Sequence, residues 1–290
     1  MDNLILCSTG AFIHNWNGLD HTLIKKLSPR LSYPGFELFM FDRYADHPEE
    51  YARVAETVDS AAADGVMFYS MHMNKIIGKL ISRDGDGDLE SAVRIFTSNC
   101  EYAVRYGVRL LVLHLWGGPP SDKNIGANMA AFPILKKISD RHGLILTVEN
   151  IVCNTHRPLG HMKKLWQLYP NDAKFTIDVR QAEFHKSLAE TCDSSFLWDN
   201  GLVSHLHVND FEGGHMDWER LRVNVPLGRG DVDFGYFFPF LKSIGFGGSV
   251  AVESGYGSET GFDGIVRDLN ESYEFIKNGL RQKCRRSNTK

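Results

Sequence analysis

The sequence has no long apolar run and no surplus of basic residues, and each absence removes a class of function. Its 290 residues include 36 Asp and Glu against 32 Lys and Arg, which gives a formal net charge of −4. Binding to nucleic-acid phosphates requires clustered Lys and Arg, so this balance disfavours nucleic acid as a partner. The most apolar stretch, Leu110–Trp116, is far shorter than the roughly 20 residues of a membrane helix. We therefore expect no membrane association and a small-molecule partner.

Cysteine is also scarce and scattered. The five cysteines form no Cys-x-x-Cys pair, and their number is odd. Such usage is typical of reduced thiols in a cytosolic protein rather than of a disulfide framework. The first residues contain no basic leader followed by an apolar segment of signal-peptide length. We expect a cytoplasmic location.

Short apolar runs alternate with longer amphipathic segments along the chain. Near-continuous apolar runs of a few residues are typical of parallel strands that are buried on both faces. Strands are predicted at Leu4–Ser8, Phe36–Phe41, Gly65–Met71, Leu110–His114, Leu144–Glu149, Lys174–Asp178, Val203–Val208 and Gly248–Glu253. Helices are predicted at Leu19–Lys26, Pro48–Ala63, Leu89–Tyr106, Asn128–Arg141, Met162–Leu168, Ala182–Glu190, Phe234–Ser243 and Gly264–Asn278.

This alternation predicts an α/β fold, a single (β/α)8 TIM barrel. Strict alternation requires right-handed crossovers and a parallel sheet, and eight repeats is the number that closes the barrel. An open doubly wound sheet is the alternative, but no Gly-rich dinucleotide fingerprint follows the first predicted strand. No segment is rich enough in Gly and Pro to separate two domains. We expect one barrel domain over residues 1–280 and a basic, disordered tail over residues 281–290.

Six consecutive predicted strands end in a His or a carboxylate. These residues are His72, His114, Glu149, Asp178, His207 and Glu253. In a TIM barrel the C-terminal ends of the strands converge around one axis, where active sites lie. A single His at such a place is usually a hydrogen-bonded rim residue, and a single Glu usually faces solvent. Six in a row favour a metal site, because buried charges are paired or coordinate metals.

The types of ligand narrow the choice of metal. Imidazole and carboxylate ligands without a thiolate suit Zn²⁺, Mn²⁺, Fe²⁺ or Co²⁺ better than Ca²⁺, which prefers oxygen ligands alone. Mg²⁺ is a further candidate. One ion is expected on Glu149, Asp178, His207 and Glu253. Candidate ligands for a second ion are His72 and His114, with Glu149 as the bridge.

Several short motifs around these residues carry a family resemblance. They are Met71-His-Met, Leu113-His-Leu, Val148-Glu-Asn, Ile177-Asp-Val, His205-Leu-His-Val-Asn-Asp, Pro226-Leu-Gly-Arg-Gly-Asp-Val-Asp-Phe and Ala251-Val-Glu. Over essentially its whole length the chain resembles the xylose isomerase-like barrel superfamily. That superfamily holds sugar and sugar-phosphate isomerases and epimerases, inosose dehydratases and endonuclease IV.

In the epimerase branch, the resemblance implies one metal ion and an acid/base pair of Glu149 and Glu253. One Glu takes a proton from the carbon next to a carbonyl, the ion stabilises the enediolate, and the other Glu returns the proton. The expected activity is that of a metal-dependent isomerase or epimerase acting on a sugar, a sugar phosphate or a related polyol or keto compound. A dehydratase or lyase that acts on an inosose-type substrate through the same intermediate is an alternative.

The endonuclease IV branch is the other alternative. It implies a zinc phosphodiesterase that acts on abasic DNA, with one zinc on His72, His114 and Glu149 and another on Glu149, Asp178, His207 and Glu253. A third zinc in that branch needs a His three residues after the sixth-strand Asp, where this sequence has Gln181. The net charge of −4 also disfavours DNA as the substrate.

Candidate substrate-binding residues surround the predicted metal site. They are His72, His114, Asn150, Gln181, Arg157 and Asp210. Arg157 is expected on a pocket-side loop, where it can bind a phosphate or a carboxylate. Gln181 departs from the ketose 3-epimerases, in which a His at this place touches the substrate. The identity of the sugar-like substrate therefore stays open. The sequence also leaves open whether the chain forms a homo-oligomer.

Overall fold

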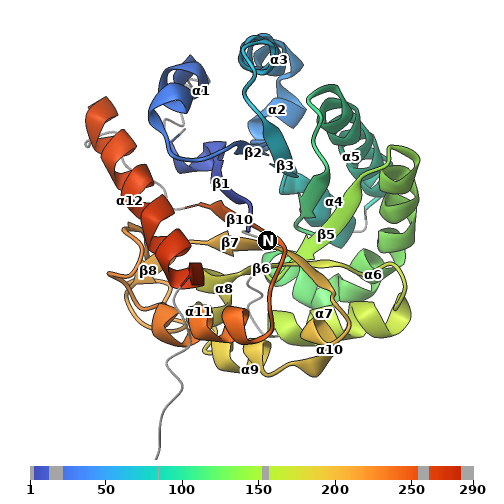
Figure 1. Cartoon of the computed structure of the whole chain (residues 1–290). Coiled ribbons are helices and arrows are strands. Elements are labelled where there is room, and N and C mark those ends of the chain that lie inside the picture. The colour runs from blue at the N-terminus through green and yellow to red at the C-terminus, as the bar shows by residue number, and fades with distance from the viewer. Residues whose placement is uncertain (1–2, 13–21, 84, 152–156, 254–260, 282–290) are drawn as a thin grey trace, which may run out of the picture.

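Eight parallel strands close into a barrel at the centre of the molecule, with helices around them (Figure 1). The computed structural model describes residues 3–12, 22–83, 85–151, 157–253 and 261–281. The strands are β1 (Ile5–Ser8), β2 (Phe36–Phe39), β3 (Phe68–His72), β4 (Leu110–Leu113), β5 (Ile145–Glu149), β6 (Phe175–Asp178), β7 (Val203–Val208) and β10 (Ser249–Val252). Because β1 pairs with both β2 and β10, the sheet has no free edge. The predicted TIM barrel and its eight strands are confirmed.

Helices connect successive strands on the outside of the barrel, as predicted. They are α1 (Thr22–Leu27), α3 (Pro48–Ala63), α5 (Asp88–Arg105), α6 (Gly118–Arg141), α7 (Pro158–Leu168), α8 (Val179–Phe184), α11 (Phe234–Ser243) and α12 (Gly261–Arg281). Two 3-10 turns, η1 (Thr9–Ala11) and η2 (Ser28–Arg30), lie beside β1 and α1. Within the described ranges no helix is long and apolar enough to cross a membrane. Of the predicted tail, only Arg281 is described, and it ends α12.

Some elements differ from the prediction. The single helix predicted over Ala182–Glu190 is wrong: the chain forms α8 and then α9 (Leu188–Cys192). Lys186 separates the two helices with a φ of 53°, which a continuing helix cannot contain. The helix predicted over Asn128–Arg141 begins ten residues earlier, as α6, with a non-helical residue at Asn124.

Further elements were not predicted at all. They are the short helices α2 (Arg43–Asp46), α4 (Ile76–Arg83) and α10 (Ser195–Trp198), and the antiparallel pair β8 (Asp210–Glu212) and β9 (Arg222–Val225). Helix α4 follows β3, and α5 then leads to β4, so this repeat contains two helices instead of one. The β8–β9 pair extends the loop after β7, next to the C-terminal ends of the strands.

The barrel interior is polar directly beneath the strand ends. Side chains alternate along a strand, so residues two apart share a face. On β5, Thr147 lies below Glu149 on the inner face, and its hydroxyl is 2.7 Å from that of Thr176 on β6. On β2, Glu37 is fully buried and accepts a hydrogen bond from Ser70 of β3. The apolar faces pack outward against the helices, so the polar residues form a layer under the barrel mouth.

Cysteines and the aromatic cluster of α11 belong to the packed interior. Cys7, Cys100 and Cys192 are buried free thiols, whereas Cys153 and Cys284 lie outside the described residues. Phe237 is fully buried, and the ring of Phe238 lies 5.7 Å from that of Phe275 on α12. The Phe-rich segment of α11 therefore packs against α12 and forms core.

Candidate metal centre

Four of the predicted ligands meet at the mouth of the barrel. One ligand atom from each of Glu149, Asp178, His207 and Glu253 lies within 4.8 Å of the other three. Nδ1 of His207 is 2.9 Å from Oε1 of Glu149 and 3.4 Å from Oε2 of Glu253. Glu149, Asp178 and His207 are almost completely buried, and the side chain of Glu253 is 13% exposed. The structure thus brings together the set predicted for one ion, with its open side at Glu253.

The charges of this set are unbalanced. Burial raises the pKa of Asp178 to about 6; Arg180 opposes this rise, whereas Glu149 and Glu253 add to it. Burial by itself would lower the pKa of His207, but Glu253, Glu37 and Glu149 raise it well above its ordinary value. Three carboxylates therefore share one imidazole. A group of this composition lacks positive charge, which a bound divalent cation would supply.

The second predicted cluster also forms. Nε2 of His114 lies 2.6 Å from Oε2 of Glu149 and 3.1 Å from Nε2 of His72. Nδ1 of His72 is 3.0 Å from the carbonyl oxygen of Met73, to which it donates. A neutral His72 with its proton on Nδ1 has a lone pair on Nε2, which faces His114 and Glu149. Burial lowers the pKa of His114 to about 3, although Glu149 opposes this shift, so the ring of His114 is available as a neutral ligand.

Two asparagines position Asp178. Asn150 accepts from the backbone N–H of Asp178 through Oδ1 (2.6 Å) and donates through Nδ2 to its carbonyl (3.0 Å). Asn209 donates to Oδ2 of Asp178 (3.1 Å), and Oδ1 of Asp178 caps α8 by accepting from the N–H of Gln181 (2.9 Å). The amide of Asn150 is thus used to hold a ligand in place. Its predicted contact with substrate stays a prediction.

Asp210 is not a member of the four-residue ligand group, and its predicted contact with substrate stays a prediction. It is fully buried and accepts backbone N–H bonds from Phe211, Gly228, Gly230 and Val232. A side chain on Gly230 would clash with this loop, because its Cβ would lie 2.2 Å from the carbonyl oxygen of Phe211. The geometry therefore explains the Leu-Gly-Arg-Gly-Asp-Val-Asp motif as a loop wrapped around one carboxylate.

Gln181 and Arg157 were also predicted to bind substrate, and both contacts stay predictions. Gln181 is half-buried in the first turn of α8, beside Asp178. Arg157 immediately precedes α7, its side chain is 62% exposed, and Nη1 is 2.8 Å from Oε2 of Glu190. Of the two, only Gln181 contacts a candidate ligand directly.

Sequence reasoning missed Glu37, a buried carboxylate that contacts His207 from below. The prediction considered only the residues that end each strand, and Glu37 is the second residue of β2. A charged residue inside an apolar strand was the available signal, because such a residue is rarely buried without partners.

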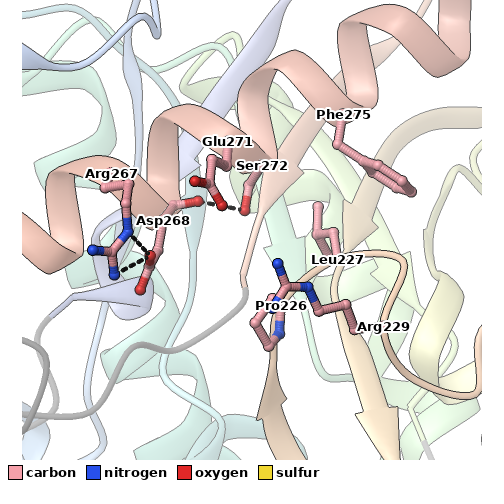
Figure 2. Close-up of a pocket in the computed structure, with 8 residues that line it drawn as sticks. All are labelled: Pro226, Leu227, Arg229, Arg267, Asp268, Glu271, Ser272 and Phe275. Carbon is pink, nitrogen blue, oxygen red and sulfur yellow. Dashed lines mark hydrogen bonds and ion pairs between the residues drawn. The ribbon is translucent and has the colours of Figure 1, made fainter.

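The structure also has a surface pocket that is distinct from this centre (Figure 2). It has a volume of about 440 Å³ and lies between α12 and the loop that carries Arg229. Arg267 and Asp268 pair at its rim, with 2.9 Å between Nη2 and Oδ1, and Phe275 lines its wall. None of the candidate metal ligands lines this pocket.

Comparisons with known proteins agree with this architecture. A family model described as a xylose isomerase-like TIM barrel matches residues 27–278. Among solved structures, D-psicose 3-epimerase from Clostridium cellulolyticum H10, solved with D-tagatose, is 14% identical with a TM-score of 0.67; the match covers 95% of this chain and 99% of that chain. In a search of curated protein sequences nothing matched the chain.

Two further structures are similar at the same level. The IolI protein with a zinc atom is 14% identical with a TM-score of 0.72, and the match covers 96% of this chain and 99% of that chain. The 3-keto-D-glucoside 4-epimerase YcjR from E. coli is 13% identical with a TM-score of 0.63, over 96% of this chain and 100% of that chain. At these identities the likeness establishes a shared fold.

Proposed function

The chain belongs to the xylose isomerase-like TIM barrel family, and from this premise we propose that it is a divalent-metal-dependent isomerase or epimerase of a sugar, a sugar phosphate or a related polyol or keto compound. The observation that carries the proposal is the convergence of Glu149 and Glu253 on Nδ1 of His207. Glu149 is the last residue of β5 and Glu253 follows β10, and β6 and β7 separate these two strands in the barrel. The two glutamates therefore approach the centre from different directions.

The two glutamates are suited to transfer a proton. Isomerisation next to a carbonyl requires one group to remove a proton from carbon and a group to return it. Glu149 is buried and held by His114 and His207, so its position is fixed and water is excluded from it. Glu253 is the most exposed member of the set, so it can exchange its proton with solvent. We assign Glu149 and Glu253 as the acid/base pair.

The donor set fits a divalent ion. Its three carboxylates and one imidazole are the ligand types that Zn²⁺, Mn²⁺, Fe²⁺ and Co²⁺ accept, and the mouth of the barrel leaves one side for substrate. An ion held by Glu149, Asp178, His207 and Glu253 would supply the positive charge that favours negative charge developing on a substrate oxygen. Asn150 and Asn209 would keep Asp178 oriented toward such an ion.

The comparisons support a sugar substrate without identifying it. Two of the similar structures are named as epimerases of sugars or glycosides, and a third is described with a zinc atom. A dehydratase or lyase on an inosose-type substrate would use the same proton abstraction, so it stays the nearest alternative. The cytoplasmic location and a homo-oligomeric state stay predictions.

One observation favours a second candidate, a zinc phosphodiesterase. The lone pair of His72 faces His114 and Glu149, and this arrangement can hold a second ion. Against it, Gln181 stands where a third zinc ligand would be needed, and His215 lies 2.8 Å from Glu183, with which it pairs. Metal analysis decides between the two: one ion per chain supports the isomerase, and two ions with cleavage of abasic DNA support the phosphodiesterase.

The direct test of the isomerase is exchange of substrate hydrogen with solvent. Metal-loaded protein is incubated in D₂O with ketoses, their phosphates and inososes, and deuterium incorporation is measured by mass spectrometry. We expect incorporation with at least one compound, and a loss of 10²-fold or more in Glu149→Gln and Glu253→Gln, since general acid–base catalysis contributes about 10²–10⁴-fold. Glu56→Gln, at an exposed position, is the control. Absence of exchange with every compound would refute the proposal.

A further inference from the structure

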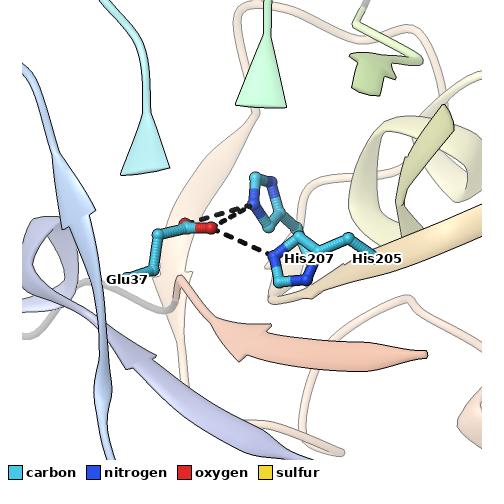
Figure 3. Close-up of side chains that lie close together, drawn as sticks. All are labelled: Glu37, His205 and His207. Carbon is cyan, nitrogen blue, oxygen red and sulfur yellow. Dashed lines mark hydrogen bonds and ion pairs between the residues drawn. The ribbon is translucent and has the colours of Figure 1, made fainter. Parts of the chain in front are cut away.

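Directly below the candidate metal centre, one carboxylate contacts two histidine rings (Figure 3). Glu37 of β2 and His205 and His207 of β7 are all completely buried. Oε2 of Glu37 is 3.0 Å from Nε2 of His205, and Oε1 is 3.2 Å from Nε2 of His207. The hydroxyl of Ser70 donates to the same carboxylate at 2.9 Å. Glu37 thus lies on the far side of His207 from Glu149 and Glu253.

The hydrogen bonds determine which nitrogen of each ring carries a proton. An ionised carboxylate only accepts, so both rings present an Nε2–H to Glu37. His205 then has a lone pair on Nδ1, which accepts from the hydroxyl of Ser249 at 2.7 Å. Without an ion, Nδ1 of His207 also carries a proton, which it donates to Glu149. An ion that displaced this proton would leave the Nε2–H on Glu37 and the lone pair of His207 on Nδ1. That atom is the one that lies 2.9 Å from Glu149 and 3.4 Å from Glu253.

We propose that Glu37 is a positioning residue that holds the Nε2–H of His207 and thereby directs the Nδ1 lone pair of His207 to a divalent ion at the barrel mouth. The proposal rests on the metal-dependent function proposed above. Glu37 itself touches neither substrate nor ion. A carboxylate that fixes the orientation and tautomer of a ligating His also raises its basicity, and loss of such a partner typically weakens metal binding by about 10–100-fold.

The same three residues could instead ligate an ion of their own. The surrounding hydroxyls argue against that arrangement. Nδ1 of His205 accepts from Ser249 and Nε2 of His205 donates to Glu37, so both ring nitrogens of His205 have partners without an ion. An ion at this position would also need the lone pair on Nε2 of His207. The proton of a neutral His207 would then lie on Nδ1, which faces the candidate metal centre at the barrel mouth.

The test compares two buried variants. Glu37→Gln preserves size but offers one acceptor oxygen to two Nε2–H groups, so His207 is no longer held in one tautomer. Thr147→Val, the control, alters the same polar interior, where the Thr147 hydroxyl bonds to the Leu111 carbonyl and the Thr176 hydroxyl. We expect the affinity for Zn²⁺ or Co²⁺, measured by competition with a chromophoric chelator, to fall about 10–100-fold in Glu37→Gln and to stay within about twofold in Thr147→Val.

A second measurement needs no substitution at Glu37. Nitrogen-15 NMR of histidine in the Zn²⁺-loaded wild type, assigned against a His207→Gln sample, reports which ring nitrogen is protonated. We expect a proton on Nε2 of His207 and metal on Nδ1. Metal on Nε2 of His207, an ion on His205, or equal affinity in both variants and wild type would overturn the inference.

The outcomes separate this inference from the proposed function. Weakened binding in Glu37→Gln together with absence of isotope exchange in any sugar would support the role of Glu37 and refute the isomerase. Unchanged binding in Glu37→Gln together with exchange would refute the role of Glu37 alone. A wild-type chain that binds no divalent ion would refute both.

Discussion

At the scale of single residues, buried polar groups in the barrel are held in defined orientations by hydrogen bonds to their neighbours. His72 donates to a backbone carbonyl, His205 and His207 donate to Glu37, and His114 faces Glu149. Each contact fixes which atom remains free to face the centre. The chemistry at the barrel mouth thus depends on residues that do not reach it.

His114 makes the stability of the metal-free protein depend on pH. Burial lowers its pKa to about 3, with partial opposition from Glu149, whereas a His in an unfolded chain has a pKa of about 6.5. Above pH 6.5 both states are neutral. As the pH falls below 6.5, only the unfolded chain takes up the proton, so stability is lost progressively down to about pH 3; at pH 5.5 the loss is about 1.4 kcal/mol.

We expect His114→Asn to remove this loss. The free energy of unfolding in urea is compared at pH 7.5 and pH 5.5 for metal-free wild type, His114→Asn and His47→Asn. The side chain of His47 is 52% exposed, and this variant should keep the wild-type difference. Asp178 is common to all three proteins, so its opposite contribution cancels. A wild-type difference that persists in His114→Asn would contradict the prediction.

The six strand-end residues could be predicted because the C-terminal ends of all strands in a TIM barrel lie at the same end of the barrel. Glu37 could not be found by that rule, since it comes from the body of β2 and acts through His207. The hydrogen-bond partners of Asn150 and Asp210 also could not be predicted from the sequence. Both lie next to ligand-bearing strand ends, but only the structure shows that they bond to backbone groups.

At the scale of elements, helices α4 and α6 pack closely against the C-terminal end of β4. Helix α4 packs against the segment after β4 through Gly78, where a Cβ would lie 2.2 Å from the carbonyl oxygen of His114. Asn128 of α6 completes the contact by donating to the carbonyls of Leu115 (2.7 Å) and Gly78 (3.1 Å). This packing determines where β4 ends and therefore where His114 lies.

We expect Gly78→Ala to destabilise the protein by about 2 kcal/mol or more, because backbone atoms must shift to accept the methyl group. Gly126→Ala is the matched control. Gly126 is an exposed helical residue of α6. A Cβ added at this position would have no atom within 4 Å, so alanine should be neutral or stabilising by up to about 1 kcal/mol. Urea denaturation midpoints measure both. Equal stability of the two variants would show that the α4 contact is loose.

The elements that were predicted well are those with a strong local signal. The strands are short apolar runs, and several helices end at Gly or begin near Pro. The elements that were missed depend on distant contacts. Helix α4 is held by the segment after β4 and by α6, and the loop after β9 wraps around Asp210, the first residue of β8. The break between α8 and α9 falls at Lys186, which has a positive φ. Lysine, unlike glycine or asparagine, does not indicate such a backbone conformation in the sequence.

At the scale of the whole molecule, the candidate centre concentrates negative charge at the barrel mouth. Its members come from four neighbouring strands or their C-terminal ends, so the charge repulsion acts between these strands. A ligand that binds only the folded state stabilises it by mass action, and a dication also relieves this repulsion.

We therefore expect one of Mn²⁺, Zn²⁺, Co²⁺, Fe²⁺ or Mg²⁺ to raise the melting temperature of chelator-treated protein. At a free concentration of 100 times Kd, the gain in the free energy of unfolding is about 2.7 kcal/mol. Differential scanning fluorimetry measures the shift, which should be lost in Asp178→Asn and kept in Asp199→Asn, a substitution at an exposed position. A melting temperature that no divalent ion changes would argue against a metal centre.

The closure of the barrel by β1 and β10 has a consequence for folding. Ile5 pairs with Val250, so the last pairing joins residues from the two ends of the chain. Contacts of such long sequence separation form slowly, because loop closure must precede them. During synthesis on the ribosome, β1 and β7 lack this neighbour until the last strand has emerged, and unpaired strand edges promote aggregation. We expect nascent chains that lack β10 to depend on chaperones in a way that the completed barrel does not.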